Sequence, residues 1–96
     1  MKIIAISRRQ PGASLERIQA LQVAEARAVW TLIGAGVIRE MHFDRDRPCA
    51  IVTLEAASVA EAASHLATLP MVREGQIDFD YYSAGPFRQL EHLFAT

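Results

Sequence analysis

Short runs rich in β-branched and apolar residues recur along the chain, each bounded by Gly, Pro or charged residues. Several of these runs alternate between apolar and polar side chains, as strands do when one face is buried. The two middle runs are separated by the polar segment Arg45-Asp46-Arg47-Pro48, so we expect them to form a hairpin. The predicted strands are residues 3–7, 37–44, 49–55 and 77–82.

Two longer segments carry their apolar residues at helical spacing instead. Across residues 15–33 the apolar side chains fall on one stripe at about 100° per residue, and Ser14 precedes them as an N-cap. Ser58 and Glu61 have the spacing of a capping box, in which the two side chains satisfy backbone donors at the start of a helix. This second helix is expected to end before Pro70.

The resulting order, β-α-β-β-α-β, is that of the ferredoxin-like α+β fold, an antiparallel sheet with both helices on one face. The other sheet face is left bare and needs a partner, because an exposed sheet promotes aggregation. A second copy of the chain is the simplest cover, and the amphipathic segment 87–94 is suited to reach across such an interface. We therefore predict one domain over residues 1–96, assembled as a homodimer or higher homo-oligomer, with the tail 86–96 packing on the partner.

Composition excludes several classes of protein. Ten basic residues nearly cancel eleven acidic ones, giving a net charge of −1, and this argues against a nucleic-acid or anionic-membrane surface. No segment approaches the roughly 20 apolar residues of a membrane span, and the N-terminal apolar run is too short for a signal peptide. We predict a cytoplasmic protein. The single cysteine, Cys49, excludes an intramolecular disulfide and a Cys₂His₂ zinc site.

Motifs for bound cofactors are also missing from the sequence. There is no Gly-rich phosphate loop, no G-x-S-x-G turn and no Walker-type lysine, since Lys2 is the chain's one lysine. His42 and Asp44 are two residues apart on one predicted strand, which is a weak metal signal that arises by chance in many chains. We expect neither a cofactor nor a metal.

Glu25 is the main anomaly in the apolar stripe of the first helix. It falls between Leu21 and Leu32 on one side and Ile18 and Val29 on the other. A carboxylate in that position is either paired or has its proton affinity raised by desolvation, and the latter would suit proton abstraction near neutral pH. The alternative is a helix rotated enough for Glu25 to reach solvent at the edge of the stripe.

Two residues on the predicted strands are further candidates for the site, because of the strand faces on which they lie. Strict alternation puts Arg39 on the helix-facing side with Val37, Met41 and Phe43, where it would neutralise Glu25 or bind an anionic substrate group. Its alternative is a strand-end arginine in water. Tyr81 lies on the apolar face of the last strand, where it would donate to an enolate oxygen or simply belong to the core.

The remaining candidates are Gln22, Trp30 and His42. Gln22 is close to Glu25 on the first helix, and Trp30 borders the same stripe as core packing or as a pocket wall. His42 has the ordinary pKa best placed for acid–base work, but it shares a strand face with Glu40 that should meet the partner. It is therefore a catalytic candidate or an interface residue.

Four segments together resemble the muconolactone isomerase-like group of dimeric α+β barrel proteins, over roughly residues 15–90. They are Ser58-Val59-Ala60-Glu61-Ala62, Leu69-Pro70-Met71, Ile77-Asp78-Phe79-Asp80 and Gly85-Pro86-Phe87. The resemblance implies a barrel-forming dimer that uses no cofactor and moves a proton within a small unsaturated lactone. In the isomerases the first helix carries a Lys and a Glu facing the pocket. Here Glu25 matches the acidic position, and Gln22 stands where the lysine would be.

Three functional hypotheses follow. The first is a cofactor-independent isomerase-like enzyme that transfers a proton on a small unsaturated lactone or enol, with Glu25 and His42 as catalytic residues. Gln22, Trp30, Arg39 and Tyr81 would bind its substrate. The second is a cofactor-free monooxygenase-like protein acting on electron-rich aromatics, and the third is a module that binds a ligand without chemistry.

Overall fold

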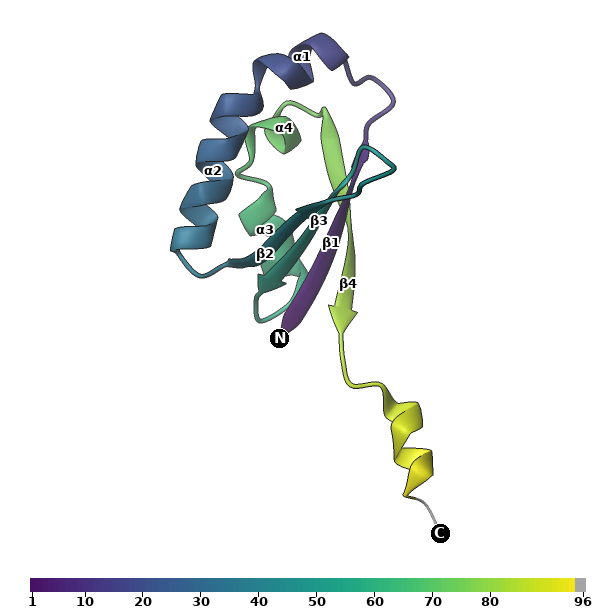
Figure 1. Cartoon of the computed structure of the whole chain (residues 1–96). Helices are drawn as coiled ribbons and strands as arrows, with labels where there is room; N and C mark the ends of the chain where they lie inside the picture. Colours follow the sequence, from purple (N-terminus) through teal and green to yellow (C-terminus); the bar gives the residue numbers. More distant parts are fainter. Residues whose placement is uncertain (95–96) are drawn as a thin grey trace.

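The computed structural model describes residues 1–94 and has the ferredoxin-like α+β fold (Figure 1). Four antiparallel strands form one sheet in the order β2-β3-β1-β4, which confirms the predicted fold class. The elements are β1 Lys2–Arg9, α1 Leu15–Ala20, α2 Gln22–Gly34, β2 Ile38–Phe43, β3 Ala50–Glu55, α3 Val59–Leu66, α4 Pro70–Arg73, β4 Ile77–Ala84 and the 3₁₀ helix η1 Arg88–Leu93.

The first helical segment differs from the prediction, because it is two helices rather than one. The chain turns at Leu21, whose φ of −91° and ψ of −3° depart from helical values, although its N–H still reaches Arg17 O at 3.1 Å. The side chain of Leu21 is buried, whereas α1 and α2 themselves contain no buried residue. The turn therefore lets one apolar anchor point inward while the two helices arch over the end of the sheet (Figure 1).

Both predicted caps are present. Ser14 Oγ accepts a hydrogen bond from Arg17 N at 3.3 Å, and Ser58 Oγ accepts one from Glu61 N at 3.1 Å. The reciprocal bond of the capping box is displaced by one residue, since Glu61 Oε2 accepts from Ala57 N at 2.5 Å. The start of α3 is thus fixed from both sides, as the sequence pattern indicated.

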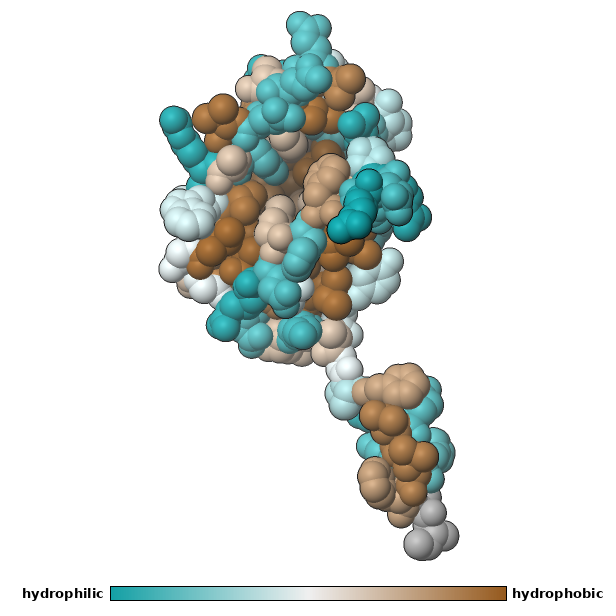
Figure 2. All heavy atoms as spheres, in the orientation of Figure 1, coloured by the Kyte–Doolittle hydropathy of each residue, from teal (hydrophilic) through white to brown (hydrophobic). Residues whose placement is uncertain are grey.

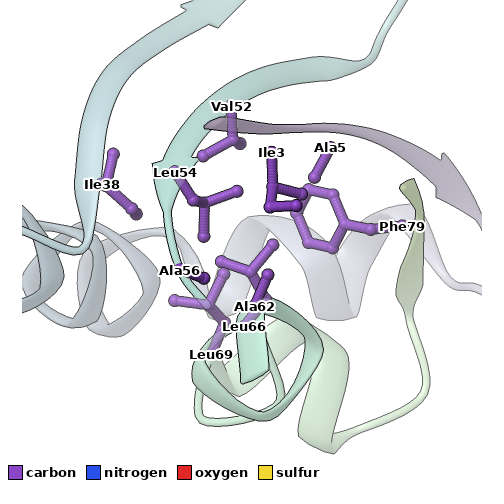
Figure 3. Close-up of a cluster of buried hydrophobic side chains, with 10 residues drawn as sticks. All are labelled: Ile3, Ala5, Ile38, Val52, Leu54, Ala56, Ala62, Leu66, Leu69 and Phe79. Carbon is purple, nitrogen blue, oxygen red and sulfur yellow. The ribbon is translucent and has the colours of Figure 1, made fainter. Parts of the chain in front are cut away.

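The hydrophobic core lies between α3 and the sheet (Figure 3). Ala62 and Leu66 are fully buried on one face of α3, and Leu69 is buried just before α4. Side chains from every strand meet them there. The buried cluster is Ile3, Ala5, Ile38, Val52, Leu54, Ala56, Ala62, Leu66, Leu69 and Phe79.

β2 contains a β-bulge, so the faces on which its side chains lie differ from those predicted by strict alternation. Ile38 pairs with Leu54 and Glu40 pairs with Thr53, so Arg39 is an extra residue without a partner on β3. The bulge shifts the alternation, and Ile38 is buried in the core instead of sharing the outer face with Glu40. Arg39 does not follow the helix-facing side, as strict alternation had predicted.

The opposite face of the sheet has no helix over it within residues 1–94. Its central row comes from β1 and β3, where Ile6 pairs with Ile51, and Tyr82 of β4 adds a ring that is 55% exposed. Beyond β4 the tail projects away from the body (Figure 1), and its side chains include Phe87, Leu90 and Leu93, all exposed. None of the helices over residues 1–94 is long and apolar enough to cross a membrane.

Candidate active site

A cavity of about 490 Å³ lies between the arch of α1 and α2 and the sheet. It occupies the end of the sheet where β1 and β2 finish and β3 and β4 begin, so it continues the space that α3 fills with core side chains at the other end. Apolar residues gather between α2 and the sheet in the space-filling view (Figure 2). The volume is typical of sites that bind small organic molecules.

The helical wall of the cavity is one stripe of α2, extended by α1. Residues three or four apart lie on one face of a helix, and this spacing joins Glu25 to apolar neighbours and to one amide. From α1 come Leu15, Ile18 and Gln19, and from α2 come Gln22, Glu25, Ala26, Val29, Trp30 and Ile33.

The opposite wall is the helix-facing side of the sheet. It is mostly apolar, and its polar side chains are Ser7 and Arg9, at the end of β1. The strands contribute Ser7, Arg9, Met41, Phe43, Ala50, Ile77 and Phe79, and Pro48 and Met71 complete the lining.

Glu25 is the one carboxylate among the lining residues described, and it is half-buried. Its Oε1 accepts a hydrogen bond from Met71 N at 2.9 Å, which ties α2 to the first turn of α4. Burial raises the pKa of Glu25 above its usual value, and the hydrogen bond from Met71 offsets that rise in part. The predicted desolvation of this carboxyl is therefore seen, with burial as the larger effect.

The structure brings two further predicted residues to the same cavity. Gln22 lies about one turn before Glu25 on α2, and Trp30 lies five residues beyond it, further along the same helix. The indole of Trp30 is 73% exposed, so it forms a rim of the cavity and is not core packing. Glu25 and Gln22 thus share one helix face, and Trp30 lies at the border of the stripe, as the sequence predicted.

Arg39, Tyr81 and His42 are not among the residues that line the cavity. The bulge turns Arg39 away, and its Nε donates to Gly36 O at 2.7 Å, so the expected approach to Glu25 is wrong. Tyr81 packs against the core with its ring 6.3 Å from that of Phe79, and burial, followed by the nearby charge of Asp78, raises its pKa.

His42 lies on the outer sheet face, where it pairs with Ile51 and is exposed. This is the face that the sequence assigned to a partner, and it is turned away from Glu25. Nearby, Asp44 Oδ1 accepts hydrogen bonds from Asp46 N and Arg47 N at the β2–β3 loop. Among residues 1–94, no group of three His, Cys, Asp or Glu lies close enough to hold a metal ion.

Ser7 and Arg9 were missed at the sequence level. The signal that could have found them is the alternation along β1, where the helix-facing positions are Ile3, Ala5, Ser7 and Arg9. The side chains on this face are apolar where they join the core and polar where they line the cavity. A strand covered by packed helices along its full length would remain apolar.

Comparison with known proteins identifies the fold but no family. Neither a protein-family model nor a curated protein matches the sequence. Among solved structures, the chain is similar to 5-chloro-2-hydroxyhydroquinone dehydrochlorinase from Burkholderia phenoliruptrix in complex with 2,5-dihydroxybenzoquinone. The TM-score is 0.72, the identity is 16%, and the match covers 93% of this chain and 98% of the other.

A second solved structure is a putative antibiotic biosynthesis monooxygenase from Deinococcus radiodurans. Its TM-score is 0.52 at 17% identity, over 90% of this chain and 94% of that one. At such identities the two likenesses establish the shared α+β fold. The specific resemblance to muconolactone isomerases stays a prediction from the sequence.

Proposed function

We propose that the protein is an enzyme that transfers a proton on a small unsaturated ring compound, such as an enol, a phenolic or an unsaturated lactone. The observation that carries this proposal is Glu25, a half-buried carboxyl in an otherwise largely apolar cavity. A base works best when its pKa lies near the operating pH, and burial moves the pKa of Glu25 in that direction.

The chemistry needs no group beyond this chain and its substrate. The ionised carboxylate of Glu25 takes a proton from an acidic C–H or O–H of the ring, and the bond electrons delocalise into the adjacent π system. The same carboxyl then returns the proton to another atom, so the sum of atoms and charges is unchanged. The hydrogen bond from Met71 N fixes one carboxyl oxygen, which leaves the other to face the substrate.

One solved structure of similar fold supports the size and type of substrate. The dehydrochlorinase was captured with 2,5-dihydroxybenzoquinone, a single oxygenated ring, and its fold aligns over nearly all of this chain. A cavity of about 490 Å³ accommodates a molecule of that size. Gln22 and Trp30 would bind the ring from the helical side, through an amide and an aromatic face.

We also propose a homodimer assembled through the uncovered sheet face, with His42 as an interface residue. The apolar row around Ile6 and Ile51 supports this, together with the exposed apolar side of the tail. A sheet face with an uncovered apolar row at its centre and an amphipathic tail with an exposed apolar side favour association with a second copy.

The test is solvent-deuterium exchange, because it reports proton transfer directly. Wild-type protein is incubated in D₂O with a panel of hydroxyquinones, phenolic acids and unsaturated lactones, and incorporation is followed by NMR. We expect enzyme-dependent exchange on a ring carbon, and a loss of about 10²-fold or more in Glu25→Gln. Glu16→Gln is the matched control, since Glu16 is an exposed carboxylate on α1.

Two results would count against the proposal. Exchange that persists in Glu25→Gln would remove the proposed base, and no exchange by wild type on any member of the panel would favour a binding module. Oxygen consumption measured in parallel separates the monooxygenase hypothesis, and sedimentation of each variant checks that the assembly is unchanged.

A further inference from the structure

The end of β1 places two neighbouring, exposed arginines on opposite faces of the sheet. Arg8 points to the outer sheet face, where its Nε lies 3.1 Å from Asp80 Oδ1 and a terminal nitrogen lies 3.6 Å from Asp78 Oδ2. Arg9, the next residue, lines the cavity. No carboxylate of residues 1–94 lies within ion-pair distance of Arg9, although it shares the cavity with Glu25.

This arrangement is unusual because the rest of the wall around Arg9 is apolar. Ile77 is the strand partner of Arg9 on β4, and Phe43 and Phe79 line the same sheet wall. Arg9 is exposed to solvent, but on its cavity side the apolar walls lower the local dielectric below that of water, which strengthens its attraction for an anion in the cavity. A guanidinium also presents paired N–H donors that match the two oxygens of a carboxylate.

Ser7 adds a second donor on the same side. Its side chain is buried, and its Oγ accepts a hydrogen bond from Ala50 N at 2.8 Å. Because that bond uses a lone pair, the hydroxyl proton is left to donate, and no acceptor for it is found among residues 1–94. Ser7 and Arg9 are two positions apart on β1, so their side chains lie on one face of the strand.

We propose that Ser7 and Arg9 form an anion-binding site in the sheet wall of the cavity, selecting a planar ring with one anionic oxygen group, a carboxylate or a phenolate. The proposal rests on the proposed function only in taking this cavity to be the substrate site. It also sets the orientation of the ring. The anionic group faces the sheet, and the reacting edge faces Glu25 on α2.

The positive charge has a second use during the reaction. Removal of a proton by Glu25 leaves a further negative charge on the ring. A guanidinium already beside the ring stabilises that charge without reorganising. Arg9 would also offset the repulsion between an anionic ring and the carboxylate of Glu25, which shares the cavity.

The test compares the binding of two probes of similar shape, the anion benzoate and the neutral benzamide. Each is titrated into the protein and its affinity is measured by calorimetry. We expect wild type to bind benzoate about tenfold more tightly than benzamide. Arg9→Gln should remove this preference while benzamide binding stays the same. Arg9→Lys should retain part of it, because the charge remains but the paired geometry is lost.

Arg8→Gln is the matched control, since it removes the same charge one residue away on the other face. It should keep the tenfold preference of wild type. The inference is overturned if wild type does not bind benzoate, if it binds both probes equally, or if Arg9→Gln retains the preference. These outcomes are separate from the deuterium-exchange result, so the anion site can fail while proton transfer by Glu25 stands, and the reverse.

Discussion

The two ends of the helical layer use the same sheet in opposite ways. α3 buries Ala62 and Leu66 completely against it, whereas the longer α2 contains no buried residue at all. The difference comes from the side chains that each helix presents. α3 offers alanine and leucine, which allow close approach, and α2 offers Glu25, Gln22 and the large Trp30. One end therefore supplies stability and the other supplies space.

This division explains why an apolar stripe need not be a core. The side chains on the stripe of α2 contact a cavity, and some of them remain open to solvent, so they contribute less burial energy than those of α3. Arg17 holds α1 through two hydrogen bonds to Glu74, at 2.6 and 2.7 Å. The arch is thus held by this exposed contact together with the buried Leu21 and partly buried residues such as Leu32, whereas α3 is held by fully buried side chains.

The largest expected contrast is between two truncations. Leu66→Ala removes a fully buried side chain and should lower the free energy of unfolding by about 3 kcal/mol. Ile33→Ala removes a cavity-lining side chain that is already 37% exposed, and should cost less than about 1 kcal/mol. Urea unfolding of both variants measures the difference. Equal losses would contradict the distinction between packed and open ends.

A smaller contrast is expected from adding volume. Ala62→Leu forces extra methyl groups into the packed core and should destabilise the protein by about 1–3 kcal/mol. Ala26→Leu extends into the cavity and should leave the melting temperature nearly unchanged, while it weakens benzamide binding. Thermal unfolding and calorimetry on the same two variants decide this. A marked loss of stability in Ala26→Leu would mean that the cavity has no room.

The smallest effect concerns the charge of Glu25. The pKa of Glu25 in the folded protein is raised above the ordinary 4.5, so ionisation of this carboxyl opposes folding. The protonated carboxyl therefore stabilises the fold fully below pH 4.5, and this stabilisation is lost as the pH rises through the folded pKa. Glu25→Gln should therefore be more stable than wild type near pH 7, by less than about 1 kcal/mol because the carboxyl is half open to solvent. Urea titrations at pH 7 and pH 4 should show the difference shrinking on acidification. If Glu25→Gln is more stable than wild type by the same amount at pH 4, the added stability does not come from removing the charge of Glu25.

Much of the fold can be predicted from the sequence because it depends on short-range patterns. The Ser14 cap, the capping box at Ser58 and the alternation in β4 are local, and each is present in the structure. The turn at Leu21 cannot be predicted from the sequence, because the helical spacing of apolar residues continues across it. The direction of the chain there depends on the burial of the Leu21 side chain.

The site was only partly predictable for a related reason. Glu25 stood out because a carboxylate interrupts an apolar stripe, and Gln22 and Trp30 follow from helix spacing. Arg39 was misplaced because a bulge leaves no clear trace in the alternation of a six-residue strand. Ser7 and Arg9 were overlooked because a strand that ends in polar residues normally indicates only that it has reached the surface.

The bulge at Arg39 makes the cavity sensitive to residue number as well as to residue type. Ile38 reaches the core, and Met41 and Phe43 reach the cavity, because one extra residue separates the two groups. Loss of Arg39 alone would restore regular pairing and keep Ile38, Met41 and Phe43 on the helix-facing side, because Ile38 and Met41 would then be two positions apart. Loss of His42 instead would place Phe43 next to Met41 and turn it to the outer face. The effect of a deletion in this strand on the binding space therefore depends on its position, since the bulge absorbs a loss at Arg39 and no other.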